Sequence, residues 1–305
     1  MAGDVLVGLE VAVEGVAGWL SSWNGGDSPH AISRGLFAGE VGVPRLLKLF
    51  ERLDVRATWF LPGHSIETFP RQMRQVIEAG HEIAAHGYSH EHPRLMTPEQ
   101  EERVLVRSIE LIEQLSGRRP AGYCAPNWDV SAVTVDLLLK HGFTYDHSLM
   151  HHDAQPYYVR TGDTWTRLDY SKSADEWMKP LVRGTETSLV EIPVHWHLAD
   201  IPPLMFIKGS PTSQGFVPTR EVEHLWREHF DWIAREYDYA VFTLSLHPDV
   251  IATPHALPML ERFIRGVREL PDARFATFEE IAADFASRRP PSGPGAYGGA
   301  GRAGT

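Results

Sequence analysis

Short apolar segments with β-strand character alternate with amphipathic helical segments along nearly the whole chain, and this alternation limits the possible folds. Strand-like segments span 5–13, 55–63, 81–86, 189–194 and 239–246. Parallel strands need long crossover connections, which are usually helices, so strands that alternate with helices predict a parallel sheet or barrel. The sequence therefore predicts an α/β fold.

Helical periodicity appears between these strands, and several of the helices carry end signals. The clearest start is Thr97, which is followed by a proline and, three residues later, by the glutamine of a capping box. This helix is expected to end at Gly117, and a second capping box begins at Thr277. Further helices are expected over four segments, and short strands near Gly122 and Phe143. The four segments are 41–53, 71–80, 131–141 and 219–237.

Two segments lack such periodicity. The stretch 15–40 is too long for an ordinary connection, and long loops of this kind often line binding sites. Residues 289–305 are rich in Gly, Pro and Ala and cannot bury enough surface to fold. We find no internal repeat and predict one domain over 1–288, followed by a disordered tail over 289–305.

Charge and composition restrict the partners. The formal net charge is −11 with no block of Lys or Arg longer than two, which argues against a nucleic-acid surface. Glu10 and Glu14 interrupt the apolar N-terminal segment, so a signal peptide is not expected, and no apolar segment approaches the length of a membrane span. Cys124 is the only cysteine, which excludes intrachain disulfides and suits a reducing compartment. We expect a cytoplasmic protein that binds a small molecule and neither nucleic acid nor membrane.

Two histidines and a carboxylate form a candidate metal site. His86 and His90 are four residues apart, a spacing that brings two imidazoles together on a helical turn or tight loop. Glu10, Ala12 and Glu14 share one face of the predicted strand VGLEVAVEG (7–15), because strand side chains alternate with period two. Two imidazoles and one carboxylate can hold a catalytic zinc ion with an open position for water. A pair of hydrogen-bonded core histidines would give the same spacing.

Further candidates lie at the ends of other strands. His247 follows the strand 239–246 and precedes Pro248, and a histidine at the carboxyl end of a barrel strand is typical of a catalytic group. Asn127 and Trp128 are candidates for lining a pocket, because tryptophan offers a flat apolar wall with one donor. Nothing in the sequence around Cys124 indicates a nucleophile, so we expect a small buried residue there.

Several longer motifs resemble one known family. They read SRGLFAGEVGVPRLL (33–47), ATWFLPGHSIETFP (57–70), AGHEIAAHGYSHE (79–91), LLLKHGFTYDHSLMHHD (137–153) and LHPDV (246–250). Together they resemble the polysaccharide-deacetylase superfamily, also called the NodB-homology fold. The resemblance covers about residues 5–288 and is strongest to the branch of cyclic-imide hydrolases, allantoinase-like proteins and a peptidoglycan-deacetylase-like protein.

The resemblance implies a distorted (β/α)7 barrel with its site at the carboxyl ends of the strands. Carried over by position, Glu14, His86 and His90 would bind a divalent metal, zinc first among the candidates, and His247 would be the general acid. Asp200 would orient a site histidine. Arg34, Asn127 and Trp128 would contact the substrate. Family members include tetramers, so a homo-oligomer, tetramer or dimer, is expected.

The chain departs from the family pattern in its first motif. The resemblance implies two aspartates where this sequence has Ala12 and Glu14, one of them the general base and the other a metal ligand. Alanine accepts no proton, and glutamate moves its carboxylate by roughly 1.5 Å relative to aspartate. Glu10, two residues earlier on the same strand face, could replace the missing base, although about 6.6 Å of strand separates the two positions.

Three functions follow from these features. The first is hydrolysis of a non-peptide C–N bond, in an amide, cyclic imide or N-acyl group of a small molecule, by water bound to the metal, with His247 protonating the leaving nitrogen. The second is a repurposed barrel that performs isomerisation, cyclisation or lyase chemistry with or without metal, because position 12 lacks the base. The third, a non-catalytic binding protein, leaves His247 unexplained.

Overall fold

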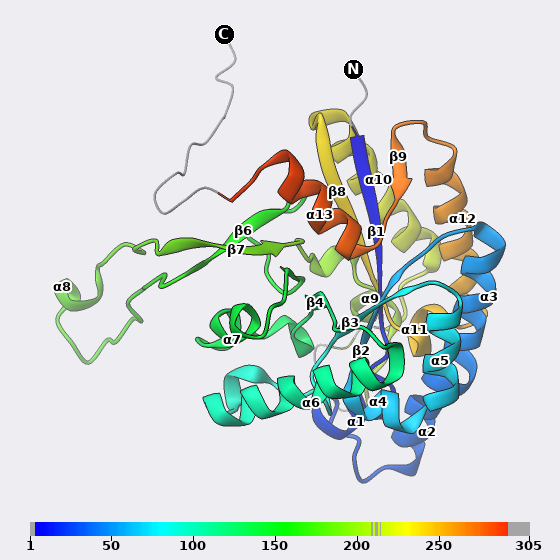
Figure 1. The fold of residues 1–305 in the computed structure, drawn as a ribbon, viewed down its shortest axis with the longest axis horizontal. Coiled ribbons are helices and arrows are strands. Elements are labelled where there is room, and N and C mark those ends of the chain that lie inside the picture. The colour runs from blue at the N-terminus through cyan, green and yellow to red at the C-terminus, as the bar shows by residue number, and fades with distance from the viewer. Residues whose placement is uncertain (1–3, 209, 211–212, 214, 292–305) are drawn as a thin grey trace.

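The computed structural model describes residues 4–208, 210, 213 and 215–291, and these residues form one curled sheet wrapped by helices (Figure 1). The sheet has nine strands in the order β6-β7-β5-β4-β3-β2-β1-β8, with β9 paired to β1. The strands are β1 (Asp4–Ala12), β2 (Thr58–Leu61), β3 (Glu82–Ala85), β4 (Gly122–Tyr123), β5 (Tyr145–Asp146), β6 (Tyr157–Thr161), β7 (Thr185–Glu191), β8 (Tyr239–Leu246) and β9 (Ala273–Phe275).

Helices connect these strands and cover the outside of the sheet (Figure 1). The α-helices of the first half are α1 (Gly15–Ser21), α2 (Pro29–Phe37), α3 (Val43–Leu53), α4 (Gly63–Thr68), α5 (Pro70–Glu78), α6 (Pro98–Ser116) and α7 (Thr134–Lys140). Those of the second half are α8 (Ala174–Trp177), α9 (Ile201–Leu204), α10 (Thr219–Glu236), α11 (Pro248–Ile251), α12 (Leu257–Arg268) and α13 (Phe278–Arg288). Four short segments have other helical forms. They are the π-helical turn η1 (Ala38–Gly42) and the 3-10 turns η2 (Pro93–Leu95), η3 (Pro126–Trp128) and η4 (Trp196–Leu198).

The predicted α/β barrel is confirmed. All strand pairs in the described residues are parallel except β6 with β7. The sheet therefore has a parallel path of seven strands from β7 to β8. No strand pairing in the described part of the chain joins β8 back to β6 or β7, so the barrel is open on that side.

Strand β1 separates two apolar cores. Its odd-numbered residues, such as Val7 and Leu9, pack outward against the helices, while Leu6 faces the inside of the barrel. Helix α13 closes the barrel at the amino ends of the strands, where Phe278 is fully buried. A side chain at Gly8 would begin 2.3 Å from Cε1 of Phe278, so this close approach requires glycine. Phe278 thus fills the inside of the barrel from the amino ends of the strands.

Two of the departures from the sequence expectations concern the stretch 15–40 and the segment from β6 to β7. The stretch 15–40, predicted as a long loop, forms α1 and α2, and Ser28 caps α2 by accepting a hydrogen bond from the backbone of Ala31. Strands β6 and β7 with α8 form a projecting arm that the sequence analysis did not predict (Figure 1).

The predicted division into a domain over 1–288 and a tail over 289–305 stays a prediction, because residues 292–305 lie outside the described residues. Among the helices of the described chain, none combines the length and apolar character that crossing a membrane requires.

Candidate metal centre and active site

His86 and His90 lie in the loop that follows β3. The strand ends at Ala85, and the backbone then turns sharply, with positive φ at Gly87 (66°) and at His90 (62°). A left-handed conformation is uncommon for a residue with a side chain and is found where surrounding structure enforces it. The spacing of four residues therefore comes from a tight loop rather than from a helical turn.

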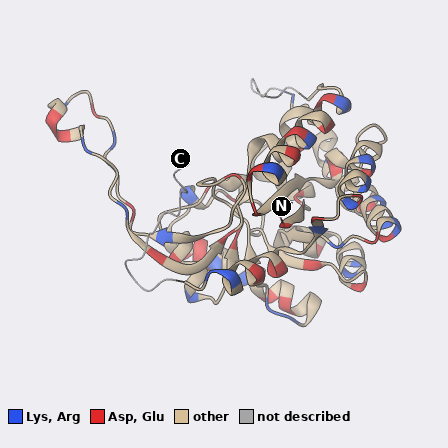
Figure 2. Ribbon diagram, turned by 90° about the horizontal axis from the view of Figure 1, so that it is seen from above, with Lys and Arg blue, Asp and Glu red and all other residues tan. Residues whose placement is uncertain are grey.

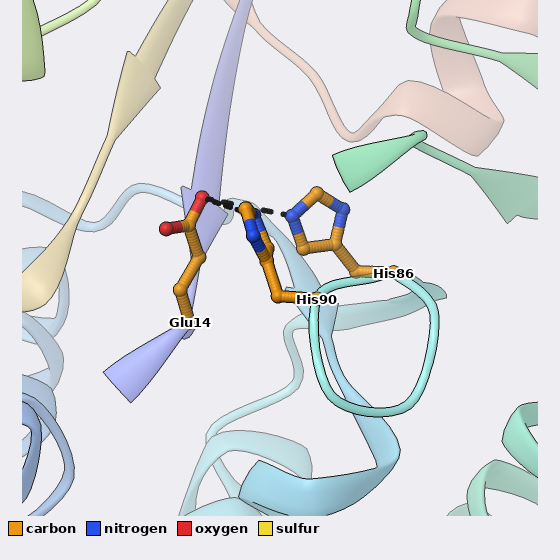
Figure 3. Close-up of side chains that lie close together, drawn as sticks. All are labelled: Glu14, His86 and His90. Atoms are coloured by element: carbon orange, nitrogen blue, oxygen red, sulfur yellow. Dashed lines mark ion pairs between the residues drawn. The ribbon is translucent and has the colours of Figure 1, made fainter. Parts of the chain in front are cut away.

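Glu14 follows β1 but does not belong to it. The strand ends at Ala12, and Glu14 has helical backbone angles (φ −64°, ψ −43°) at the start of α1. The expectation that Glu10, Ala12 and Glu14 share one strand face is therefore wrong for Glu14. The turn at Gly15, whose φ is +53°, directs the Glu14 side chain toward the two histidines instead (Figure 3).

The three side chains converge on one point. Oε1 of Glu14 lies 2.9 Å from Nε2 of His90 and 3.7 Å from Nε2 of His86. One potential ligand atom from each residue lies within 4.8 Å of the others, and all three residues are buried. Figure 3 shows both imidazoles turned toward the carboxylate.

The hydrogen bonds of the two imidazoles leave one nitrogen of each free. Nδ1 of His86 donates to the carbonyl oxygen of Cys124 at 2.7 Å, and Nδ1 of His90 lies 2.7 Å from the hydroxyl of Ser22. Nε2 of both histidines and Oε2 of Glu14 are buried without a hydrogen-bond partner. Unsatisfied buried polar atoms are costly, and metal-binding histidines usually use their second nitrogen in this way. The three residues therefore fit a divalent metal ion with nitrogen and oxygen ligands.

The charges of the cluster favour its ligand form. Burial raises the pKa of Glu14, but the neighbouring His90 and His247 outweigh this effect and hold the pKa well below its ordinary value. Burial lowers the pKa of His90 despite the opposing charge of Glu14. An ionised carboxylate beside a neutral imidazole is the combination that a metal ion requires.

His247 lies beside this cluster and is held by Asp200. Its Nδ1 donates to Oδ1 of Asp200 at 2.6 Å, and its backbone N–H donates to Oδ2 at 2.8 Å. Nε2 of His247 faces Oε1 of Glu14 at 3.2 Å. Burial lowers the pKa of His247, but the charges of Asp200 and Glu14 outweigh it and raise the pKa well above its ordinary value. Asp200 thus orients the ring so that a protonated Nε2 points into the site.

A cavity of about 80 Å³ connects these groups to the surface. Its lining residues are Glu10, Glu14, Trp23, His86, Asn127, Trp128, Trp196, Ala199, Ile201, Ser245 and His247. Asn127 and Trp128 both have positive φ (57° and 54°), so the backbone is strained where they enter the cavity. The rings of Trp128 and Trp196 lie 4.4 Å apart between centroids, and Trp196 is half exposed.

Glu10 forms another part of the cavity wall, whereas Ala12 is buried and is not among the lining residues. Oε2 of Glu10 lies 3.3 Å from Nε2 of His147. Burial raises the pKa of Glu10, but the neighbouring His147 imidazole outweighs this effect, so the pKa lies below its ordinary value. Glu10 is therefore an ionised carboxylate inside the barrel.

The structure brings together most of the predicted site residues but not Arg34. Its guanidinium donates to the carbonyl oxygen of Phe206 and lies over the ring of Trp19, and it is not among the residues that line the cavity. A role for Arg34 in substrate binding stays a prediction. Cys124 is buried, as expected, and burial raises the pKa of its thiol well above the ordinary value.

Sequence reasoning missed several residues of the site. His147 directly follows strand β5, and Ser245 lies on β8 two residues before His247, so both carried the signal of a polar residue at the end of a buried strand. Trp23 and Trp196 come from connecting segments, where no periodicity marks which side chains turn inward.

Comparisons with known proteins agree on one family. The family model described as polysaccharide deacetylase matches residues 35–145. A peptidoglycan deacetylase from Helicobacter pylori is 58% identical over 95% of this chain and 99% of its own length. A peptidoglycan deacetylase-like protein from Gibberella zeae is 39% identical over 91% of this chain and 85% of its own. A crystal structure described as a putative polysaccharide deacetylase from Mycobacterium smegmatis superposes with a TM-score of 0.80 at 29% identity, covering 94% of this chain and 92% of that one.

Proposed function

Because this chain belongs to the polysaccharide deacetylase family, we propose that it hydrolyses the acetamido group of an N-acetylated amino sugar in a metal-dependent reaction. The relatives that show this membership also confirm the family resemblance seen in the sequence. The observation that carries the finer proposal is the meeting of two groups in one cavity. The Glu14–His86–His90 cluster and the His247–Asp200 pair contact each other through Oε1 of Glu14.

Each group has a place in such a hydrolysis. A divalent metal ion held by Glu14, His86 and His90 would polarise the amide carbonyl and lower the pKa of the attacking water. Nε2 of His247 donates a proton to the amide nitrogen as the C–N bond breaks, so that the amine leaves neutral. Asp200 keeps the imidazole in position and stabilises its protonated form. The products are acetate and a free amino sugar.

The walls of the cavity favour a sugar ring. Trp128 and Trp196 line it, Trp196 is half exposed, and aromatic faces of this kind pack well against the apolar face of a sugar ring. Two relatives are named for action on peptidoglycan, which supports an N-acetylated glycan or a fragment of one. The small amides and cyclic imides expected from the sequence remain the comparison substrates.

The test combines metal content with acetate release. We expect protein purified without a histidine tag to carry about one divalent metal ion per chain by elemental analysis, and to release acetate from oligomers of N-acetylglucosamine or from muropeptides. His86→Ala should lose the metal and the activity together. His247→Ala should keep the metal but lose about 100-fold or more in kcat. His224→Ala, an exposed histidine on α10, is the matched control and should change neither.

Two results would contradict the proposal. One is wild-type protein that binds no metal even after incubation with zinc or cobalt. The other is metal-loaded protein that releases no acetate from these glycans but opens a cyclic imide or a ureide. That result would assign a cyclic amide, and not an N-acetylated sugar, as the substrate.

One observation favours a second candidate function. Ala12 places a methyl group where the family resemblance implies a carboxylate, so the barrel could perform non-hydrolytic chemistry such as isomerisation. Ala12→Asp combined with Glu14→Asp would then create amide hydrolysis in a protein that lacks it. Hydrolysis already present in the wild-type chain would exclude this candidate.

A further inference from the structure

Glu10 is a second carboxylate in the same cavity, and the proposed function leaves it without a role. It is 1% exposed, yet it lines the cavity that Glu14, His86 and His247 also line. Apart from Glu14, it is the only carboxylate among the lining residues of this cavity. A buried ionised group of this kind is costly to maintain, so it should contribute either to structure or to chemistry.

The register of the sheet places Glu10 beside β8, the strand that ends next to His247. Strand β1 pairs with β8 so that Glu10 lies opposite Ser245 and Val11 opposite Leu246. Ala12, two residues further along β1, carries only a buried methyl group. Two residues of strand span about 6.6 Å, and the cavity of about 80 Å³ exceeds the roughly 10–15 Å³ of such volume that one water molecule needs, so a water can bridge Glu10 to the reacting centre.

His147 holds the Glu10 carboxylate in place. Its Nδ1 donates to the carbonyl oxygen of Ile192 at 2.5 Å, which directs Nε2 toward Oε2 of Glu10. The imidazole is buried and stacks on Phe60 with ring centroids 5.9 Å apart, while Phe278 meets it edge-on at 4.5 Å. Both aromatic contacts hold the ring, so its Nε2 stays directed toward the Glu10 carboxylate.

We propose that Glu10, held by His147, is the general base of the reaction and replaces a carboxylate at position 12. The proposal rests on the proposed hydrolysis. The attacking water forms the new C–O bond and passes its proton, through one bridging water, to the Glu10 carboxylate. His247 then supplies the proton that leaves with the amine as the C–N bond breaks. Glu10 then releases its proton to solvent and His247 takes one up from solvent, which restores the starting state of the enzyme.

The first test measures the charge of Glu10 without turnover. Acetate is titrated into cobalt-loaded protein and its binding at the metal is followed by visible absorption. Glu10→Gln removes a negative charge from the cavity that Glu14 and His86 also line, so acetate should bind about 5-fold or more tightly than to wild type. Metal content should be unchanged. Glu191→Gln is the matched control, because Glu191 is buried outside the cavity and burial raises its pKa well above the ordinary value.

The second test measures turnover and its rescue. Glu10→Gln should lower kcat about 100-fold, within the range expected for loss of a general base. Adding Ala12→Asp to this variant should raise its kcat by at least 10-fold, because a carboxylate then lies next to the reacting water. Ala12→Asp alone should raise kcat by less than 3-fold, since the wild-type chain already has a base. If Glu10→Gln does not fold, the kcat of Ala12→Asp alone still tests whether the wild-type chain already has a base.

The outcomes separate the two proposals. Failure of the wild-type chain to bind metal would overturn the proposed function itself. Metal-loaded Glu10→Gln protein with wild-type acetate affinity, or with kcat within 3-fold of wild type, would overturn only the role of Glu10. So would a 10-fold or larger gain from Ala12→Asp alone. If no glycan is hydrolysed, the acetate titration still decides whether Glu10 presents its charge to the metal.

Discussion

His81 shows what burial does to a single histidine at the opposite end of strand β3 from the candidate metal ligands His86 and His90. It precedes β3, whereas His86 follows the other end of that strand. Its Nδ1 accepts a hydrogen bond from the backbone of Ala57 at 3.1 Å, and its ring packs on Phe50 and Trp59. Burial, with a smaller contribution from the charge of Arg56, lowers the pKa of His81 from 6.5 to about 4.

This lowered pKa makes a prediction about stability in acid. The unfolded chain binds a proton at His81 below about pH 6.5 and the folded chain only below about pH 4, so stability is lost as the pH falls through this range. We expect His81 to account for about 2 kcal/mol of that loss, somewhat less than the full shift because the ring is not completely buried. His81→Asn retains an acceptor for Ala57 and should lose less stability. Urea unfolding of both proteins at pH 7 and pH 4.5 measures this, and equal losses would contradict the assignment.

At the scale of the elements, local end signals define where the helices begin. In α6 the Thr97 hydroxyl accepts from the backbone N–H of Gln100, and the Gln100 side chain accepts from the N–H of Thr97. The helix ends at Gly117, which has a left-handed conformation (φ 72°). The same capping box recurs at Thr277 in front of α13. These helices were therefore predicted within a residue or two at their starts.

The cap of α6 should contribute measurably to stability. Thr97→Ala leaves a backbone N–H of the first turn without its partner and should lower the free energy of unfolding by about 1 kcal/mol. Thr219→Ala is a suitable control, because Thr219 begins α10 without any side-chain cap. Denaturant unfolding of the three proteins makes the comparison. An equal effect of both substitutions would mean that the cap contributes nothing beyond helix propensity.

At the scale of the whole molecule, the arm formed by β6, α8 and β7 is the most exposed part of the fold (Figures 1 and 2). Its apolar side chains with more than half of their surface exposed are Trp165, Leu168, Tyr170, Met178, Leu181 and Val182. Residues 162–184 carry four Lys or Arg and four Asp or Glu, so the arm is neutral in a chain of net charge −11. A neutral apolar arm meets little repulsion from a second copy of the same acidic chain.

We therefore expect the chain to form a dimer or tetramer through this arm. The combined substitution of Trp165, Leu168 and Leu181 by serine should shift the mass measured by light scattering toward that of one chain. Trp232→Ser, which changes an exposed tryptophan on α10, should leave the mass unchanged. A wild-type chain that is monomeric at all concentrations would contradict the expectation.

Local sequence patterns indicated the α/β class, the main helices and the ends of the strands that carry the chemistry. Strand periodicity, capping boxes and terminal glycines act within a few residues, so they are readable without the fold. His86, His90 and His247 each follow a predicted strand, and parallel strands present their carboxyl ends on one side of a barrel. This is why the metal-site candidates could be named in advance.

Only the tertiary structure decided how these groups meet. Glu14 lies beyond the end of β1, and the turn at Gly15 directs its side chain toward the histidines. Asp200 contacts His247 although 47 residues of sequence separate them. His147 joined Glu10 because β5 and β1 face each other across the inside of the barrel. Such contacts depend on strand order, register and side-chain direction together, which no local pattern records. The arm of β6 and β7 and the helices in 15–40 were missed for a related reason, since their periodicity is weak and tertiary contacts stabilise them.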